Sequence, residues 1–133
     1  MSEEKKIKVV LLEPGKLART AEIDASLAGM QKVVGGLIEP FYPFEEQVCI
    51  VCNEESKING MQPNRSVKNG DGVMVDFIFG PAFICDCRGE NLDSLSDEQI
   101  DRYGKMFRYP EHLARLNGKL IGIPFNPQRE HER

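Results

Sequence analysis

Two apolar runs near the middle of the chain constrain the fold more than any other feature. Val73–Phe79 and Ala82–Cys87 are separated only by Gly80-Pro81. Short apolar runs rich in β-branched and aromatic residues are typical of buried strands, and a Gly-Pro step marks a turn or a bend. The pattern therefore predicts two successive strands, or one bent strand, at the centre of a single small domain.

The N-terminal segment has the pattern of a β-hairpin. Ile7–Leu12 is apolar and β-branched, and Leu17–Ile23 can present alternate residues to two faces. Glu13-Pro14-Gly15-Lys16 joins the two segments, with proline at the second turn position and glycine at the third. Because that order is the signature of a type II turn, the segment predicts a strand, a tight turn and a return strand.

A short helix is predicted directly after this hairpin. Leu27, Met30 and Val34 recur at helical spacing, so they form one apolar stripe. Asp24 is a candidate N-cap, and Gly35 can adopt the left-handed conformation that commonly ends a helix. The helix is therefore expected to pack one face against the core.

The first half then continues with strands. Leu37–Tyr42 and Glu46–Asn53 are predicted strands, and a polar, turn-rich connection follows them. The order β-β-α-β-β predicts the α+β class, with a small mixed or antiparallel sheet arranged as a β-grasp or a similar roll. Strands and helices do not alternate one for one, which argues against a doubly wound parallel sheet.

Beyond the central strands, the chain predicts a C-terminal helical segment. Ser96 and Gln99 have the spacing of a capping box, in which each side chain bonds the other residue's backbone N–H. The helix is expected to run from Asp97 to about Phe107. Its buried stripe would consist of Ile100, Tyr103 and Phe107.

The last residues are expected to form an extension to this domain. Glu111–Asn117 is predicted as a second short helix ended by Gly118, and Leu120–Phe125 as an edge strand. We therefore expect residues 1–111 to form a single α+β domain. Residues 112–133 are expected to form a basic C-terminal extension that is partly ordered.

Length and charge limit the class of protein. The 133 residues suit one domain, and a hydrophobic content of 41% is enough to form a core. Residues 1–101 hold 10 Lys and Arg against 18 Asp and Glu, a net of −8, whereas residues 102–133 hold 7 against 3, a net of +4. The overall charge of −4 disfavours a dedicated nucleic-acid-binding protein. With neither a signal peptide nor an apolar run long enough to span a membrane, a cytoplasmic protein is expected.

Four cysteines raise the question of a metal site. Cys49 and Cys52 form a C-x-x-C pair, and Cys85 and Cys87 form a C-x-C pair. Four thiolates can bind zinc, but the first pair lies in an apolar strand, where residues three apart point to opposite faces. We therefore favour buried free thiols and keep zinc binding as the less favoured alternative.

Two groups of residues are candidates for binding. Asn64 and Arg65 lie beside a predicted turn, where an arginine can bind a phosphate or a carboxylate. It can equally bond loop carbonyl groups, and we favour that structural role. Arg102, Lys105 and Arg108 lie among aromatic residues, as in proteins that bind single-stranded nucleic acid. Here the aromatic residues belong to the predicted buried stripe, so a solvated basic face is favoured.

The chain also resembles a known family. The resemblance is carried in order by IKVVLLEPGKLARTAEID, LAGMQKVVGGLIEPFYPF, CIVCNEESKINGMQPNR, GVMVDFIFGPAFICD and SLSDEQIDRYGKMFRYPE. These segments are similar to a family of small domains of unknown function found in Firmicutes, often on conjugative elements, plasmids and prophages. The resemblance implies an accessory protein of a mobile element, and similar domains occur beside antirestriction domains. It implies no activity and no catalytic residue.

These observations favour a non-enzymatic accessory or binding protein of a bacterial mobile element. No nucleotide-binding, calcium-binding or nucleophile–base motif is recognisable, so neither a cofactor nor a catalytic residue is predicted. An unknown protein partner is the favoured interaction, no membrane interaction is expected, and a homodimer is possible. The alternatives are a nucleic-acid-associated or antirestriction-type protein and a small zinc protein.

Overall fold

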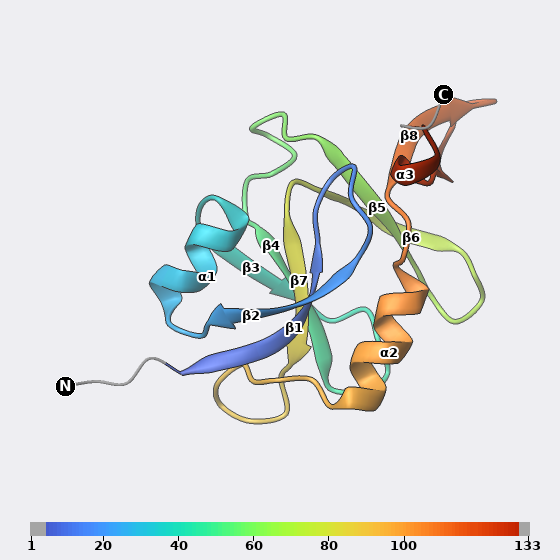
Figure 1. The fold of residues 1–133 in the computed structure, drawn as a ribbon. Helices are drawn as coiled ribbons and strands as arrows, with labels where there is room; N and C mark the ends of the chain where they lie inside the picture. The colour runs from blue at the N-terminus through green and yellow to red at the C-terminus, as the bar shows by residue number, and fades with distance from the viewer. Residues whose placement is uncertain (1–4, 131–133) are drawn as a thin grey trace.

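The computed structural model describes residues 5–130, which contain a five-stranded sheet (Figure 1). All strand pairs in this part of the chain are antiparallel. A β-grasp pairs its first and last strands in parallel, so the sheet is instead the antiparallel form of the predicted α+β fold. Its strands, in spatial order, are β2 (Arg19–Asp24), β1 (Lys6–Leu12), β7 (Ala82–Asp86), β4 (Val48–Asn53) and β3 (Ile38–Phe41).

The N-terminal hairpin forms as its turn residues predict. β1 pairs with β2 along its length. Gly15 has a φ of 75°, as the third position of a type II turn requires, and the N–H of Lys16 donates to the carbonyl of Glu13 at 3.2 Å. The return strand begins at Arg19, two residues after the predicted start at Leu17. Arg65 also donates to the carbonyls of Glu13 and Lys16, so a tertiary contact holds this connection together with the turn.

The N-cap of helix α1 (Leu27–Val34) lies two residues later than predicted. Ser26 is the N-cap, because its hydroxyl accepts from the N–H of Gly29 at 3.0 Å. Asp24, the predicted cap, ends β2 and accepts from the N–H of Ser26 at 2.9 Å. The prediction of Asp24 as the N-cap was therefore wrong, whereas Gly35 ends the helix in the left-handed conformation, as predicted.

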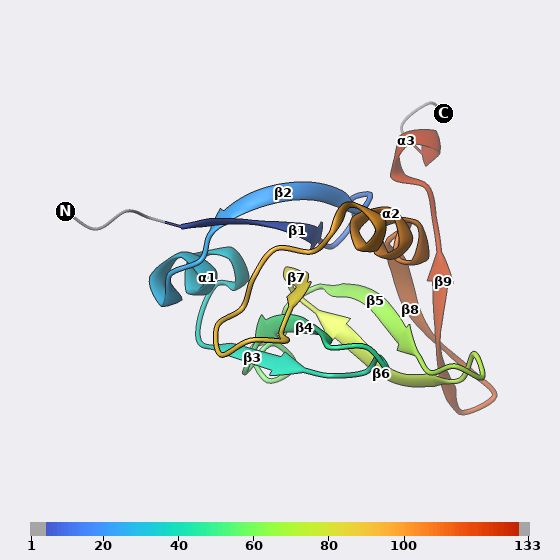
Figure 2. The same ribbon diagram turned by 90° about the horizontal axis from the view of Figure 1, so that it is seen from below.

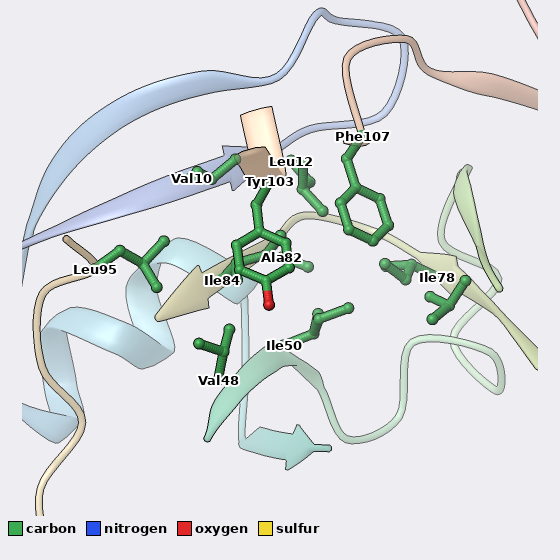
Figure 3. Packing of buried hydrophobic residues seen from close by; sticks show 11 residues of the cluster. Val10, Leu12, Val48, Ile50, Ile78, Ala82, Ile84, Leu95, Tyr103 and Phe107 are labelled. Carbon is green, nitrogen blue, oxygen red and sulfur yellow. The ribbon is translucent and has the colours of Figure 1, made fainter. Parts of the chain in front are cut away.

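The five-stranded sheet buries both of its faces (Figure 2). One face packs against α1 through Met30 and Val34. The other face packs against the second helix and a two-stranded sheet, and Figure 3 shows side chains from all three of these parts converging there. This second cluster contains Val10, Leu12, Val48, Ile50, Val67, Ile78, Ala82, Ile84, Leu95, Tyr103 and Phe107.

The two central apolar runs separate into different sheets. β6 (Met74–Phe79) pairs with β5 (Pro63–Lys68), whereas β7 joins the five-stranded sheet. The change of direction occurs at Gly80, which has a φ of 75° and where a Cβ would lie 2.5 Å from the sulfur of Met61. The sequence analysis assigned no strand to β5, because its polar residues give no apolar alternation.

Helix α2 (Asp97–Met106) has the predicted capping box, in which Ser96 accepts from the N–H of Gln99 and the Gln99 side chain accepts from the N–H of Ser96. Tyr103 and Phe107 are buried, as the stripe predicts. Within the described residues, no helix is both long and apolar enough to cross a membrane.

The C-terminal segment is a β-hairpin. β8 (Glu111–Leu116) pairs with β9 (Lys119–Pro124) across Asn117 and Gly118, which both have positive φ. The predicted helix over Glu111–Asn117 was therefore wrong, because Asn-Gly makes the two-residue turn that matches the twist of paired strands. The proposed domain boundary after residue 111 falls inside β8. A short helix, α3 (Pro127–Glu130), follows, and residues 131–133 of the predicted extension lie outside the described part.

Candidate binding cleft

A cleft of about 630 Å³ lies between α2 and the β5–β6 sheet, on the side where β8 begins. We call this cavity the α2–β5 cleft. The loop between β3 and β4 forms one wall, and the turn between β5 and β6 forms another. Its lining residues include Phe44, Glu46, Ser66, Lys68, Arg102, Tyr103, Met106, Phe107 and Glu111.

Aromatic rings form the apolar part of the cleft. The ring of Phe44 lies 4.8 Å from that of Tyr103 and 6.2 Å from that of Phe107, measured between ring centroids. Met106, 57% exposed, lies on the same helix. Aromatic and methionine side chains provide contact area for a partner at little conformational cost, as in the centres of many protein interfaces.

Glu46 organises the polar wall. Its carboxylate accepts hydrogen bonds from the Tyr103 hydroxyl, from Arg102 and from Gln99. These bonds, with the Tyr103 hydroxyl making the largest contribution, lower the pKa of Glu46 below its usual value. Burial, reinforced by the bond to Glu46, raises the pKa of Tyr103. At neutral pH the pair is therefore an ionised carboxylate bonded to a neutral phenol.

Ser66 carries an unpartnered hydroxyl. Its N–H donates to Oε1 of Glu111 at 3.0 Å, which satisfies the edge of β5 beside β8. Its Oγ is buried and has no hydrogen-bond partner among the described residues. A Cβ on Gly122 would lie 1.9 Å from Oε1 of Glu111, so the position of this carboxylate depends on glycine at residue 122.

Arg65 and Asn64 lie inside the protein rather than beside a turn. Arg65 is 1% exposed, and burial lowers its pKa to about 10. Asn64 donates to the carbonyls of Leu12 and Gly80 at 3.0 and 2.8 Å. Arg65 therefore cannot reach an external phosphate. Its acceptors are the carbonyls of Phe107, Glu13, Lys16 and Arg108 and the side-chain oxygen of Asn64.

The three predicted basic residues of α2 and its C-terminus do not share one surface. Arg102 lines the α2–β5 cleft and pairs with Glu46. Lys105 pairs with Asp101 at 3.1 Å. Lys105 and Arg108 line a different cavity, of about 380 Å³, between α2 and the β1–β2 hairpin. The arrangement therefore divides the predicted basic face between two sides of the helix.

The cysteines also divide between the two faces of the sheet. Cys49 lies opposite Cys85 on adjacent strands, with 3.8 Å between the sulfur atoms. Cys52 packs on the other face, and burial raises its pKa to about 11. Cys87 is half-buried, and burial likewise raises its pKa to about 11. Across residues 5–130, no three His, Cys, Asp or Glu side chains are arranged to hold a metal ion.

Sequence reasoning did not identify the main residues of the cleft. Glu46 was assigned to a strand, Ser66 to no element, and Glu111 to a helix. Tyr103 was predicted only as a core residue. No motif distinguishes these residues, because their proximity depends on contacts between segments separated by 45 to 57 positions.

Comparison with known proteins gives one match. No curated protein and no solved structure matches the chain. The model of the family described as "Domain of unknown function (DUF3846)" matches residues 7–108. That range covers every element from β1 to α2 and ends before the β8–β9 hairpin. The chain therefore belongs to the DUF3846 family of domains of unknown function.

Proposed function

We propose that this chain is a non-enzymatic accessory protein that binds a partner protein through the α2–β5 cleft. The observation that carries the proposal is the apolar lining of the cleft beside Ser66, whose buried Oγ has no partner. A buried polar group without a hydrogen bond costs roughly 1–3 kcal/mol, so a bound group that meets this oxygen when the Ser66 side chain turns toward the cleft regains this energy. The aromatic wall supplies apolar contact area around it.

The chemistry of the bound group follows from the lining. It has an apolar body that fits against Phe44, Met106 and Phe107, and a polar end that bonds Ser66. A protruding amphipathic side chain of a partner protein meets both requirements. The Glu46 network is already bonded internally, so it stiffens the wall and does not need the ligand.

The protonation states in the cleft support binding rather than catalysis. A general base or acid works best with a pKa near the operating pH. Here the pKa of Glu46 is lowered and that of Tyr103 is raised, so both move away from neutrality. His112 stacks on Phe125, with 4.0 Å between ring centroids, and does not line the cleft. The proposed role on a bacterial mobile element is supported by the sequence resemblance.

A pull-down with the tagged protein from a host extract, with and without added nuclease, can test this function. The cleft variant is Met106→Glu, and its matched control is Val75→Glu on β6, since the two side chains are 57% and 55% exposed. We expect a nuclease-resistant protein partner that Met106→Glu loses and Val75→Glu retains. Recovery that depends on nucleic acid, or equal loss in both variants, would contradict binding through the cleft.

A second variant tests the hydroxyl itself. Ser66→Ala removes an unpartnered buried polar group, so the free protein should gain about 1 kcal/mol of unfolding free energy while partner binding weakens. Ser94→Ala is the control, because the Ser94 hydroxyl accepts from the N–H of Lys8 at 2.9 Å and its loss should destabilise the protein. Urea unfolding of the two variants measures the change in unfolding free energy of each. A less stable Ser66→Ala protein would show that the hydroxyl is satisfied internally.

A further inference from the structure

Strand β9 has a free edge on which the protecting residues, Lys119 and Pro124, lie only at the two ends. It pairs only with β8, so its outer edge is unpaired within the described residues. From Leu120 to Ile123 the strand contains neither a charge nor a proline. Natural proteins usually protect exposed edges with charged residues, prolines, bulges or short strands. Figure 2 places the hairpin at one side of the molecule, away from α1.

The other sheet edges do carry such protection. β2 has charged residues at Arg19 and Glu22, and β3 is only four residues long and contains Pro40. β6 carries Asp76, which pairs with Lys57, and its ladder with β5 shifts register. β5 is bordered by β8, with the Glu111 carboxylate bound to its edge. β9 has its lysine and its proline only at its ends, so Leu120–Ile123 is less protected than these edges.

The outward groups of β9 follow from its register. The two-residue turn makes Leu116 and Lys119 the closing hydrogen-bonded pair, and bonded pairs then alternate along an antiparallel ladder. Lys119, Ile121 and Ile123 therefore bond to β8. The N–H and C=O groups of Leu120 and Gly122 point outward, with Ile121 between them.

This pattern is self-complementary. If two copies of β9 pair antiparallel about Ile121, Leu120 of each copy bonds Gly122 of the other, and the two Ile121 side chains lie directly opposite each other. Lys119 then lies opposite Ile123 of the second copy, so the two Lys119 charges are at opposite ends of the ladder. No like charges face each other along the paired strands.

Strand β9 also has exposed apolar side chains that lie close to the proposed second copy. Leu120 and Ile123 are both 45% exposed, and no residue of β8 or β9 is fully buried. A two-stranded sheet is marginally stable in water, and additional strands stabilise it. We propose that β9 pairs with β9 of a second copy of this chain, so that two hairpins form one four-stranded antiparallel sheet in a symmetric dimer. This dimer is independent of the proposed cleft function.

The experiment is sedimentation equilibrium of the full chain over a range of concentrations. Wild-type protein should form a dimer, and Ile121→Lys, which places two like charges directly opposite, should raise the dissociation constant at least ~10-fold. Leu116→Glu is the control, because it also places a charge on the same hairpin but on β8, the outer strand of the proposed sheet, where it faces Lys119. Leu116→Glu should remain a dimer. Thermal unfolding of each variant establishes that it is folded.

Mixing two variants tests the proposed register. Ile121→Lys and Ile121→Glu should each be monomeric alone, and their mixture should associate because opposite charges then face each other at the two-fold axis. A wild-type protein that is monomeric at every concentration would overturn the proposal. So would dissociation by Leu116→Glu, or a mixture that stays monomeric, because neither result is compatible with pairing about Ile121.

Discussion

At the scale of single residues, Arg65 shows how one buried side chain can join distant segments. It donates to carbonyl groups in the β1–β2 turn and at the end of α2, and to the side chain of its neighbour Asn64. A rigid guanidinium with five N–H donors suits this role, and a lysine ammonium does not. Carbonyl oxygens and the charge of the Glu111 carboxylate together stabilise the buried guanidinium.

Replacing Arg65 should destabilise the whole protein. Arg65→Met keeps much of the side-chain volume but leaves its acceptors without donors, so we expect a loss of roughly 3 kcal/mol in the free energy of unfolding. Arg65→Lys should recover only part of it. Urea unfolding measures the difference. A loss smaller than that of the exposed control Arg19→Met would contradict the structural role.

The lowered pKa of Glu46 predicts that the stability of the folded protein depends on pH. Its pKa in the folded protein is below the usual value of 4.5, so the unfolded state binds its proton more tightly. The stabilisation is therefore fully present above pH 4.5 and is lost as the pH falls through the lower, folded pKa. Glu46→Gln should lose less thermal stability than wild type between pH 7 and pH 3, as measured by unfolding followed with circular dichroism. Parallel curves for the two proteins would rule out this linkage.

At the scale of elements, the β8–β9 hairpin is held by its turn and by one carboxylate. Asn117 and Gly118 both adopt positive φ, and Glu111 bonds the backbone of β5. No side chain of either strand is fully buried. The hairpin should therefore open more easily than the five-stranded sheet, whose core strands are buried on both faces.

The variant Gly118→Ala tests whether the β8–β9 hairpin opens more easily than the five-stranded sheet. Alanine is strained at a φ of 82°, so we expect the hairpin to lose about 1 kcal/mol of local stability. Hydrogen exchange of β8 and β9 amides should accelerate while exchange in β1 and β7 is unchanged. Gly104→Ala in α2, where the glycine has open space and helical backbone, is the control and should not accelerate exchange in the hairpin. Equal acceleration in all four strands would mean that the hairpin unfolds only with the whole domain.

At the scale of the whole molecule, the sheet separates two apolar clusters and places thiols at different depths. Cys49 and Cys85 are fully buried in the middle of the sheet, whereas Cys52 and Cys87 are half-buried. Reagents can reach the first pair only when the sheet opens. Modification of these cysteines should therefore report global unfolding.

Thiol labelling followed by mass spectrometry can measure how fast each cysteine reacts. In native protein, Cys87 should react faster than Cys49 and Cys85, whose rates should be similar to each other. In Arg65→Met, the rates at Cys49 and Cys85 should rise in proportion to the loss of global stability. Labelling of Cys49 as fast as Cys87 would show that the sheet opens locally, contrary to this expectation.

The local features of this protein are predictable from the amino-acid sequence alone. The type II turn, the capping box of α2 and the left-handed cap of α1 each depend on residues within a few positions of one another. The α+β class and the opposite orientations of Cys49 and Cys52 also followed from periodicity. These features are predictable because neighbouring residues interact whatever the rest of the chain does.

Which distant segments meet depends on the three-dimensional fold and not on any local pattern. The pairing of β1 with β7, the strand β5, the acceptors of Arg65 and the contact between Ser66 and Glu111 all join residues far apart in sequence. The segment Glu111–Asn117 was predicted as a helix because its composition suits either a helix or a strand. Its strand structure depends on the Asn-Gly turn and on docking against β5. The cleft was not predictable for the same reason: long-range packing, rather than any local pattern, brings its walls together.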